Sequence, residues 1–582
     1  MTSESRPLSL RSIALVVFGQ LLLAVLWTYP VAFRLGRGEL WGGGPDTHQG
    51  LWNLWWSEKA LTDPATDWFF SDWIFHPAGM PLALHTFAPL KCLLAIPLGW
   101  FCAPNDCHDL LMLATFWWAG VSAYLFAYDW LGSRAAAALG SLVYACAPYH
   151  SVHALGHLNL ASIEFFPLAF LCLGRIFGVS PGFLGGTHAR LSWAVGAGAA
   201  AAAIFWVDFQ YTLFLALFAP VLWGSTRGAR TTKLAPDKRI GGALLCAGWV
   251  AALLAAPLAI QLALELRRHG MPRAEGGSDV YALDLVSVLV PSPFDPLTRP
   301  LLAPFLARFP GWYDSVERVG TVGIVSLALA GVAGLRAKAV RPWVWFGGLA
   351  WLLSLGPSLR VLGTDTHVPL PAAAFSHVPG LDQFRAPSRF QVLTVLALAI
   401  LVPAGAQRLC AGVSRRARSL IHALAFGVIA LELLAWPAIE MPLHVPGFVR
   451  ALAARPDARA VHVLASEEPE YVWMYWQTLF HKRLLLGKAA RIHPERARAA
   501  EETVTRLTQA LQPDASGRYA QPEELRATFT SLGVGYLVVS LKELAKSPRL
   551  AKRYAEMVAH LFPSGPAFQD EEYALFAFDE PG

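Results

Sequence analysis

An acid and a histidine stand at the start of a segment rich in tryptophan. In "PDTHQGLWNLWWSEKAL", Asp46 and His48 precede a cluster formed by Trp52, Trp55 and Trp56. A carboxylate can accept a proton from a hydroxyl group while the oxygen attacks another atom. Asp46 is therefore a candidate general base.

The same residues also have a purely structural interpretation. Asp46 and Gln49, three residues apart, match a capping box at the start of a surface helix. Tryptophans that follow such a start would anchor the helix at the level of the lipid headgroups. The segment alone leaves both interpretations open.

Other polar residues interrupt or flank apolar runs. They are Lys91, the histidines His150, His153 and His157 in "CAPYHSVHALGHLN", Asp208 in "IFWVDFQY", and the arginines Arg318, Arg385 and Arg389. Ionisable side chains beside a bilayer are costly, so such residues are functional candidates. Each one alone also fits a snorkelling, capping or helix-pairing role. Together they predict a polar cavity on an otherwise apolar protein.

The composition indicates the class of protein that must hold these residues in place. The chain has 582 residues, of which 55% are hydrophobic and only 15% are charged, with a mean hydropathy of +0.42. These values indicate a membrane protein with several spans. The net charge of +6 is spread over short basic clusters, which favours a role in membrane orientation and not nucleic-acid binding.

Hydropathy predicts eleven transmembrane helices. They cover residues 13–33, 109–131, 134–150, 158–178, 191–207, 210–226, 240–262, 319–335, 341–358, 389–409 and 419–438. The apolar stretch 86–103 is short and broken by Pro89 and Pro97, so it is predicted to be re-entrant or to lie on the membrane surface. Residues 34–108 then form one long first loop.

Lysines and arginines between the spans set the orientation, because cytoplasmic loops hold an excess of them. With eleven spans, the inside loops hold Arg134, Arg175, Arg190, Arg227, Arg230, Lys233, Lys238, Arg239, Arg336, Lys338, Arg341, Arg415, Arg416 and Arg418. The N-terminus is then cytoplasmic. The candidate residues lie together on the outer side.

The composition changes near residue 440, where charged residues become frequent. Strand-like runs such as "AVHVLAS" and "GYLVVSL" alternate with a charged helical stretch, "HPERARAAEETVTRLTQALQ". This alternation predicts a small α/β domain over 440–582, after a membrane domain over 1–439. Eleven spans place that domain outside the cytoplasm.

Two cysteines of the first loop are close in sequence. The spacing of Cys102 and Cys107 permits a loop disulfide. Spacing does not show the geometry of the pair, so a disulfide and two free thiols both remain open.

Several segments, taken in order, resemble a known family. They are "PDTHQGLWNLWWSEKAL", "DWIFHPAGMPLALHTFAPL", "SLVYACAPYHSVHALGHLNLASIEFFPL", "DLVSVLVPSPFDPL" and "FRAPSRF". They resemble the membrane core of GT-C type glycosyltransferases, and more narrowly a bacterial branch grouped with them. The segment "MYWQTLFHKRLLLGKAAR" resembles part of the outside domains of that branch.

The resemblance implies a GT-C-like membrane fold and an inverting glycosyltransferase of the inner (plasma) membrane. The donor would be a sugar linked to a polyprenyl phosphate, and the acceptor an extracytoplasmic glycan, lipid or protein. Asp46 matches the family's acidic residue in the first outside loop. The departing phosphate would be stabilised by Arg385, Arg389, Arg318 or Lys91. The tryptophans and stretch 86–103 would form an amphipathic surface along which the lipid tail of the donor lies.

The sequence also departs from the family. Many members have paired acids in the first loop, whereas Asp46 is followed by Thr47 and His48. No cofactor is expected. Two roles nevertheless stay open for the histidines at 150, 153 and 157. They could bind a divalent ion together with Asp46 and His48, or they could form hydrogen bonds to phosphate or sugar.

A non-catalytic role is the alternative to an enzyme. The chain could be a transporter or flippase of lipid-linked sugars, or a membrane protein of glycan assembly. A transporter should open polar residues to both membrane faces in turn. The predicted concentration of polar residues on the outer side favours the enzyme.

Overall fold

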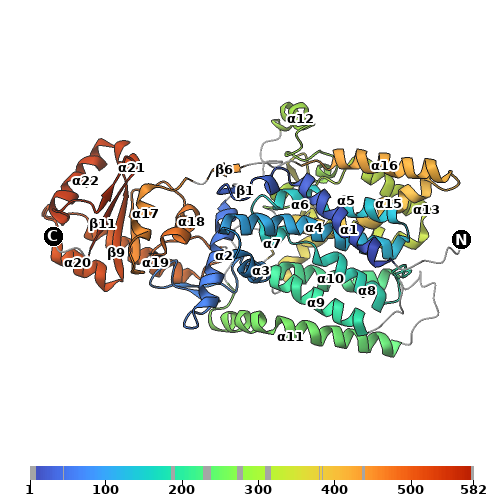
Figure 1. Cartoon of the computed structure of the whole chain (residues 1–582), viewed down its shortest axis with the longest axis horizontal. Coiled ribbons are helices and arrows are strands. Elements are labelled where there is room, and N and C mark those ends of the chain that lie inside the picture. Colours follow the sequence, from blue (N-terminus) through green and yellow to red (C-terminus); the bar gives the residue numbers. More distant parts are fainter. Residues whose placement is uncertain are drawn as a thin grey trace.

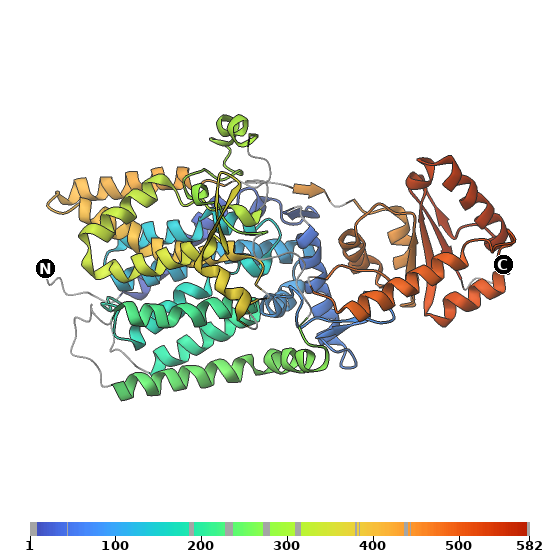
Figure 2. The same cartoon turned by 180° about the vertical axis from the view of Figure 1, so that it is seen from behind.

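The structure is a computed structural model that describes residues 8–42, 45–184, 191–226, 237–271, 280–308, 316–378, 381–382, 384–435, 440–442, 444–489 and 491–578. The molecule is elongated. A helical bundle occupies one end, which holds the N-terminus, and the C-terminal domain lies at the opposite end (Figures 1 and 2).

The bundle contains a helix for each predicted span. These helices are α1 (Leu10–Trp27), α4 (Pro104–Leu131), α5 (Arg134–Ala145), α8 (Phe165–Ile176), α9 (Leu191–Val207), α10 (Phe209–Thr226), α11 (Asp237–His269), α13 (Ile324–Arg336), α14 (Arg341–Ser354), α15 (Gln391–Leu409) and α16 (Arg415–Glu432). Several are shorter than predicted, α8 above all.

Five stretches of the described chain are long and apolar enough to cross a membrane: Leu10–Trp27, Pro104–Leu131, Leu158–Ile176, Arg239–His269 and Pro387–Leu409. Four more apolar helices, of 10–17 residues, are shorter. The chain is therefore an integral membrane protein, and the count of eleven crossings remains a prediction.

Burial separates central from peripheral helices. In the most apolar stretch of α15, 94% of the residues are buried inside the protein, against 11% in α1 and 17% in α11. The outer face of α11 exposes Leu245, Trp249 and Leu253. Exposed apolar side chains of this size mark a surface that contacts lipid or another protein.

The end of the bundle that holds the N-terminus is rich in basic residues. Arg134 donates a hydrogen bond to Ser12 at 3.0 Å, and Gln407 contacts the carbonyl of Leu131 at 3.5 Å. These contacts bring together the start of α1, the α4–α5 connection and the end of α15, beyond which the basic start of α16 follows. The predicted basic loop around Lys233 lies outside the described residues.

The other end of the bundle carries the first loop. It contains β1 (Glu39–Trp41), α2 (Pro45–Thr62), β2 (Phe70–Ser71), β3 (Met80–Pro81) and α3 (Pro89–Gly99). α3 has 11 residues and is about 16 Å long at 1.5 Å per residue. It is too short to cross a hydrocarbon core of about 30 Å.

The tryptophans of α2 do not anchor it in lipid, so this part of the prediction is wrong. Trp52, Trp55 and Trp56 are 0%, 6% and 1% exposed. They pack between the first loop and the C-terminal domain: the Trp52 indole donates to Gln477 of α18 (Glu470–Phe480) at 2.7 Å, and the Trp56 indole donates to the carbonyl of Trp68 at 3.0 Å. Indole rings are as suitable for a buried protein interface as for a membrane surface, because both offer an apolar wall and a polar partner.

The C-terminal domain is built around a mixed sheet with the strand order β10-β11-β9-β7-β8. The strands are β7 (Ala460–Leu464), β8 (Arg483–Leu484), β9 (Val534–Ser540), β10 (Phe568–Gln569) and β11 (Tyr573–Ala577), and the helices are α17 (Gly447–Ala453), α18, α19 (Pro494–Ala510), α20 (Pro522–Ser531), α21 (Leu541–Ala545) and α22 (Pro548–Leu561). β7 runs parallel to β8 and β9, whereas β11 is antiparallel to β9 and β10. The predicted α/β character is confirmed.

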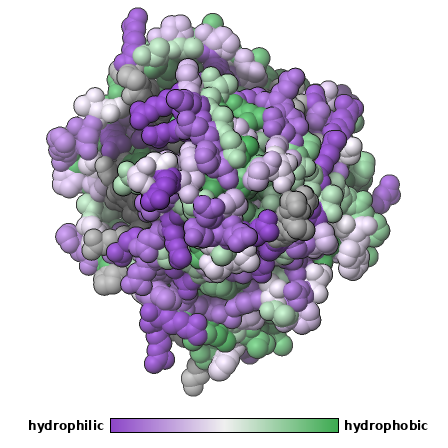
Figure 3. Space-filling model, turned by 90° about the vertical axis from the view of Figure 1, so that its left-hand side faces the viewer, coloured by the Kyte–Doolittle hydropathy of each residue, from purple (hydrophilic) through white to green (hydrophobic). Residues whose placement is uncertain are grey.

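Two layers of helices cover this sheet. α17 and α18 pack on the face that carries Val461 and Tyr536, and α19, α20 and α22 pack on the face that carries Leu537 and Val539. Seen end-on, the outer surface of the domain is mostly hydrophilic (Figure 3). Such a surface suits solvent and not lipid.

The first loop and the C-terminal domain share backbone hydrogen bonds. The amide of Leu484 donates to Trp73 at 2.8 Å, and the amide of His76 donates to Leu484 at 3.0 Å. A short strand, β6 (Glu440–Pro442), also pairs antiparallel with β1.

The two cysteines of the first loop are not joined by a disulfide. Cys102 and Cys107 have free thiols.

Candidate active site

Asp46 lies next to His157 at the junction of the bundle and the C-terminal domain. Its carboxylate is 3.1 Å from the His157 imidazole, and 37% of the Asp46 side chain is exposed. α2 begins at Pro45, so Asp46 lies inside the first turn, where the helix dipole favours a negative charge. The capping-box prediction is wrong, because Gln49 instead contacts Lys488 and Thr86.

A glycine allows this close approach. His157 follows the short helix α6 (Pro148–His153) and Gly156. A Cβ atom at Gly156 would lie 2.9 Å from the Thr47 hydroxyl and 3.6 Å from the Asp46 Cβ, which is too close for a side chain without displacement. Thr47 donates to the carbonyl of Leu155 at 3.0 Å and joins the same two segments.

His157 also affects the charge of Asp46. Burial alone would raise the pKa of Asp46, but the hydrogen bond and positive charge of His157 outweigh it and lower that pKa below its usual value. Lys488 of the C-terminal domain acts in the same direction. Asp46 is therefore ionised at neutral pH, as a base must be.

We expect this contact to be visible in a pH–rate profile. Because the pKa of Asp46 is lowered, its carboxylate stays ionised as the pH falls to about 4, and the reaction catalysed by the native protein should keep its rate down to that range. In His157→Gln, the lowering contribution is lost while burial remains, so the acid limb should move to higher pH. An unmoved limb would contradict the role of His157, and His367→Gln, at an exposed site, is the control.

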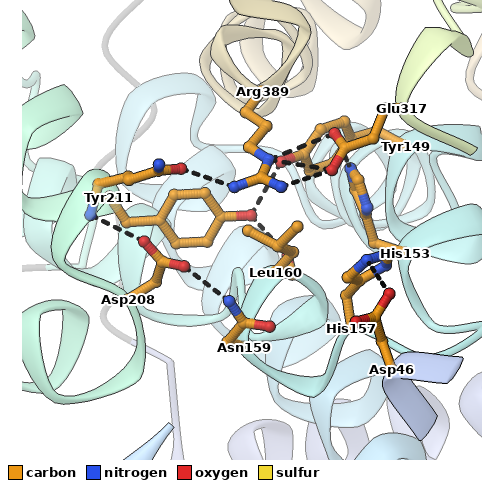
Figure 4. A network of polar contacts seen from close by, with 11 residues as sticks. Asp46, Tyr149, His153, His157, Asn159, Leu160, Asp208, Tyr211, Glu317 and Arg389 are labelled. Atoms are coloured by element: carbon orange, nitrogen blue, oxygen red, sulfur yellow. Dashed lines mark hydrogen bonds and ion pairs between the residues drawn. The ribbon is translucent and has the colours of Figure 1, made fainter. Parts of the chain in front are cut away.

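A chain of polar contacts continues from His157 into the bundle (Figure 4). The rings of His157 and His153 are 5.6 Å apart, and His153 is 4.0 Å from the carboxylate of Glu317. Arg389 binds Glu317 through Nη2 at 2.5 Å and through Nε at 3.2 Å. The remaining nitrogen of the guanidinium, Nη1, donates to Gln210 at 2.7 Å.

The charges in this chain follow from its geometry. Burial opposes ionisation of Glu317, but Arg389 beside it holds the pKa of Glu317 well below its usual range. Burial lowers the pKa of His153 to about 3. His153 is therefore neutral at pH 7, and Glu317 and Arg389 form the ion pair.

Asp208 ends the chain of contacts on the other side of the site. The backbone amide of Gln210 and the side-chain amide of Asn159 each donate to Asp208 at 2.7 Å. Nearby, the Tyr149 hydroxyl contacts that of Tyr211 at 2.8 Å, and Tyr211 donates to the carbonyl of Leu160 at 2.6 Å. These bonds fix α6, the short helix α7 (Leu158–Ala161) and the start of α10 against one another.

Two cavities adjoin this network and share a wall. The Asp46 cavity, of about 20 Å³, is lined by Asp46, His157 and Asn159 among others. The arginine cavity, of about 70 Å³, is lined by Asp208, Arg385, Arg389 and Arg491, again with Asn159. Residues 86–88 line both. The Asp46 carboxylate and a group of cations therefore line two adjacent cavities that have residues 86–88 and Asn159 in common.

Arg491 was not among the predicted site residues. It belongs to the C-terminal domain and is the last residue of the segment "MYWQTLFHKRLLLGKAAR". The family resemblance of this segment was therefore the only indication in the sequence that Arg491 could be a site residue. Burial and the neighbouring charge of Arg385 lower the pKa of Arg491. Such crowding of positive charge would be relieved by a bound anion.

Five predicted site residues do not line these two cavities in the described part of the chain: His153, which lies in the chain of contacts described above, and four others. His48 contacts Tyr471 and Tyr475 of α18, and Lys91 forms a buried ion pair with Glu164 at 2.6 Å. Arg318 donates to the carbonyl of Val280, and His150 stacks on Phe116 with ring centres 3.8 Å apart. Each has a partner within the protein.

The arrangement does not fit a metal ion. Over the described ranges, no three His, Cys, Asp or Glu side chains are grouped as ligands. Glu317 is occupied by Arg389, and Asp46 is paired with His157. We therefore assign no catalytic step to a metal.

Comparison with solved structures identifies the fold. ArnT from Cupriavidus metallidurans, in a structure bound to undecaprenyl phosphate, aligns over 98% of both chains with a TM-score of 0.51 and 12% identity. The chain has the GT-C glycosyltransferase fold. No protein-family model and no curated protein matches the sequence.

Two further solved structures share this GT-C fold. The oligosaccharyltransferase AglB from Archaeoglobus fulgidus, in complex with an inhibitory peptide and a dolichol-phosphate, aligns over 94% of this chain and 71% of its own, with 10% identity and a TM-score of 0.50. The arabinofuranosyltransferase AftD from Mycobacteria aligns over 92% of this chain and 37% of its own, with 18% identity and a TM-score of 0.51.

Proposed function

We propose that the protein is an inverting glycosyltransferase that moves a sugar from a polyprenyl-phosphate-linked donor to an acceptor outside the cytoplasm. The observation that carries this proposal is the pair of adjacent cavities, with an ionised Asp46 in one and three arginines in the other. The GT-C fold supports it, because solved structures with that fold include glycosyltransferases that were captured with polyprenyl or dolichol phosphates.

Each cavity suits one half of the reaction. The acceptor hydroxyl gives its proton to Asp46 while its oxygen forms a bond to the anomeric carbon of the donor sugar. The bond between that carbon and the phosphate oxygen breaks, and the electron pair leaves with the phosphate. Arg385 and Arg491 stabilise the developing charge, and Glu317 holds Arg389 beside them. Attack opposite the leaving group inverts the anomeric centre.

The donor lipid has a path along the bundle. Leu258 of α11 lines the arginine cavity, and the same helix exposes Leu253, Ile260 and Leu264. A prenyl chain lying on this surface would have its phosphate at the arginines. This path replaces the tryptophan surface predicted from the sequence, because those rings are buried inside the protein.

A transfer assay tests the function directly. Purified protein in lipid vesicles is given polyprenyl-phosphate sugars with a labelled sugar, and the release of polyprenyl phosphate is measured together with the anomeric configuration of the product. Release with inversion supports the proposal. Movement of intact donor across the vesicle membrane without release would indicate a flippase and would overturn it.

The proposed orientation places the N-terminus in the cytoplasm and the domain 440–582 outside the inner membrane. We expect a periplasmic-type reporter, such as alkaline phosphatase, to be active when it is fused after Gly582 and inactive when it is inserted after Lys233. The expectation rests on the basic end of the bundle, which lies opposite the C-terminal domain. The reverse activity at either position would overturn the orientation and the assignment of both cavities to the outer face.

A further inference from the structure

A third cavity lies inside the C-terminal domain, apart from the two described above. It has a volume of about 220 Å³, and its lining includes His462, Ser466, Glu468, Glu470, Trp473 and Leu485. It is larger than the Asp46 cavity and the arginine cavity together. We call it the outer-domain cavity.

Its position follows from the topology of the sheet. β7 is flanked by β8 on one side and β9 on the other, all three parallel. The connection after β7 runs through α18 on one face, and the connection before β9 runs through α19 and α20 on the other. The cavity is lined by residues at the carboxyl ends of β7 and β8. In open α/β sheets, ligands bind at the carboxyl edge, where the connections diverge.

The lining selects the chemistry of a ligand. Glu468 and Glu470 are exposed carboxylates at the start of α18, and no lysine or arginine lines the described walls of the cavity. Burial lowers the pKa of His462 to about 4, so this imidazole is neutral. Carboxylates accept hydrogen bonds from hydroxyl groups and repel anions. The apolar remainder, with Trp473 and Leu485, suits the CH faces of a sugar ring.

Residues that follow the lining segments in the chain contact α2 close to Asp46. Glu470 is followed by Tyr471, whose ring is 5.4 Å from that of His48 on α2. Leu486, on the other wall, precedes Lys488 by two residues. The Lys488 backbone carbonyl accepts from Gln49 at 3.1 Å, and its ammonium lies 5.4 Å from the Tyr471 ring. The segments that line the cavity therefore continue directly into contacts with the first turns of α2, where Asp46 lies.

We propose that the outer-domain cavity is the acceptor subsite, and that it holds a neutral, hydroxyl-rich glycan through Glu468 and Glu470. This inference rests on the proposed function and adds to it the class of the acceptor. It also gives the C-terminal domain a role in selecting the substrate, in addition to its contribution of Arg491.

Direct binding tests this subsite without requiring transfer. The full chain in detergent is titrated against fluorescently labelled neutral oligosaccharides of four to six sugars, from mannan, glucan, galactan and arabinan, with an oligogalacturonate and an unrelated peptide as comparisons. At least one neutral probe should bind. In the double variant with Glu468→Gln and Glu470→Gln, its Kd should rise by about 10-fold or more, as expected for the loss of two charge-assisted hydrogen bonds.

Two further variants make the result specific. Val463→Phe fills the cavity without a change of charge and should weaken binding similarly, which also covers the case of a double variant that folds poorly. Glu467→Gln is the matched control, because Glu467 is in the same loop but pairs with Lys546 at 2.6 Å and does not line the cavity. It should bind like the native protein.

The outcomes separate this proposal from the proposed function. If no neutral probe binds, if both cavity variants bind normally, or if the anionic probe or the peptide binds better, the glycan subsite is wrong even where transfer is observed. If Asp46→Asn and the native protein bind the same glycan but the native protein transfers no sugar, the subsite stands and the transferase does not.

Discussion

Asp46→Asn should lower the rate of sugar transfer by about 10²- to 10⁴-fold, the usual loss on removal of a general base. Asparagine keeps the shape of the side chain and can still accept a hydrogen bond from His157, but it cannot take a proton from the acceptor hydroxyl. The rate is measured with a labelled donor at saturating concentration. Thermal unfolding is followed in parallel, and its midpoint should change little because the Asp46–His157 pair is partly exposed.

Two variants make this prediction decisive. Asp46→Ala removes the hydrogen bond as well as the base, so its activity should be no higher than that of Asp46→Asn. Glu58→Gln removes an exposed carboxylate from the same helix, α2, and should leave transfer unchanged. Full activity in Asp46→Asn would limit Asp46 to a structural role at the start of α2.

Arg385→Gln should lower transfer by about 10²- to 10³-fold, the loss seen when one donor that stabilises a developing oxyanion is removed. Arg385 lines the arginine cavity beside Arg491, and the charge on the leaving phosphate develops during bond cleavage. The loss should therefore fall mainly on kcat. Arg385→Lys keeps the charge but removes the planar fork of donors, so its activity should lie between the native protein and Arg385→Gln.

The matched control is an exposed arginine that lines neither of the two cavities. Arg299 in α12 (Arg299–Leu306) is exposed, and Arg299→Gln should leave kcat and KM unchanged. If Arg385→Gln also has native kinetics, Arg385 does not contact the phosphate. Arg389 is less informative for this test, because its exchange would also leave the buried carboxylate of Glu317 without its partner.

Much of the architecture could be predicted from local sequence. Apolar runs long enough for helices mark the bundle, and the rise in charged residues near 440 marks the mixed α/β domain. Pro89 and Pro97 broke one apolar run, and the resulting helix α3 is indeed too short to cross a bilayer. These features depend on residues that are near one another in the chain, which is why periodicity and composition reveal them.

The individual partners of polar residues could not be predicted in this way. The pattern around Asp46 and Gln49 fitted a capping box, yet Gln49 contacts Lys488, more than 400 residues away. Lys91 was expected at the phosphate and instead pairs with Glu164. A residue type tells what a side chain can bind, but its partner depends on positions a few ångströms apart that only packing brings together.

The sequence by itself determined that the chain is a membrane protein with a mixed α/β domain, and it marked Asp46, His157, Asp208 and the arginines as costly polar groups beside apolar runs. Only the tertiary structure decided that Asp46 meets His157, that Arg491 from the C-terminal domain joins Arg385 and Arg389, and that the tryptophans of α2 face protein. The physical reason is that burial of an apolar face lowers the free energy against lipid or protein alike. A sequence pattern therefore shows that a face is covered, and long-range packing selects what covers it.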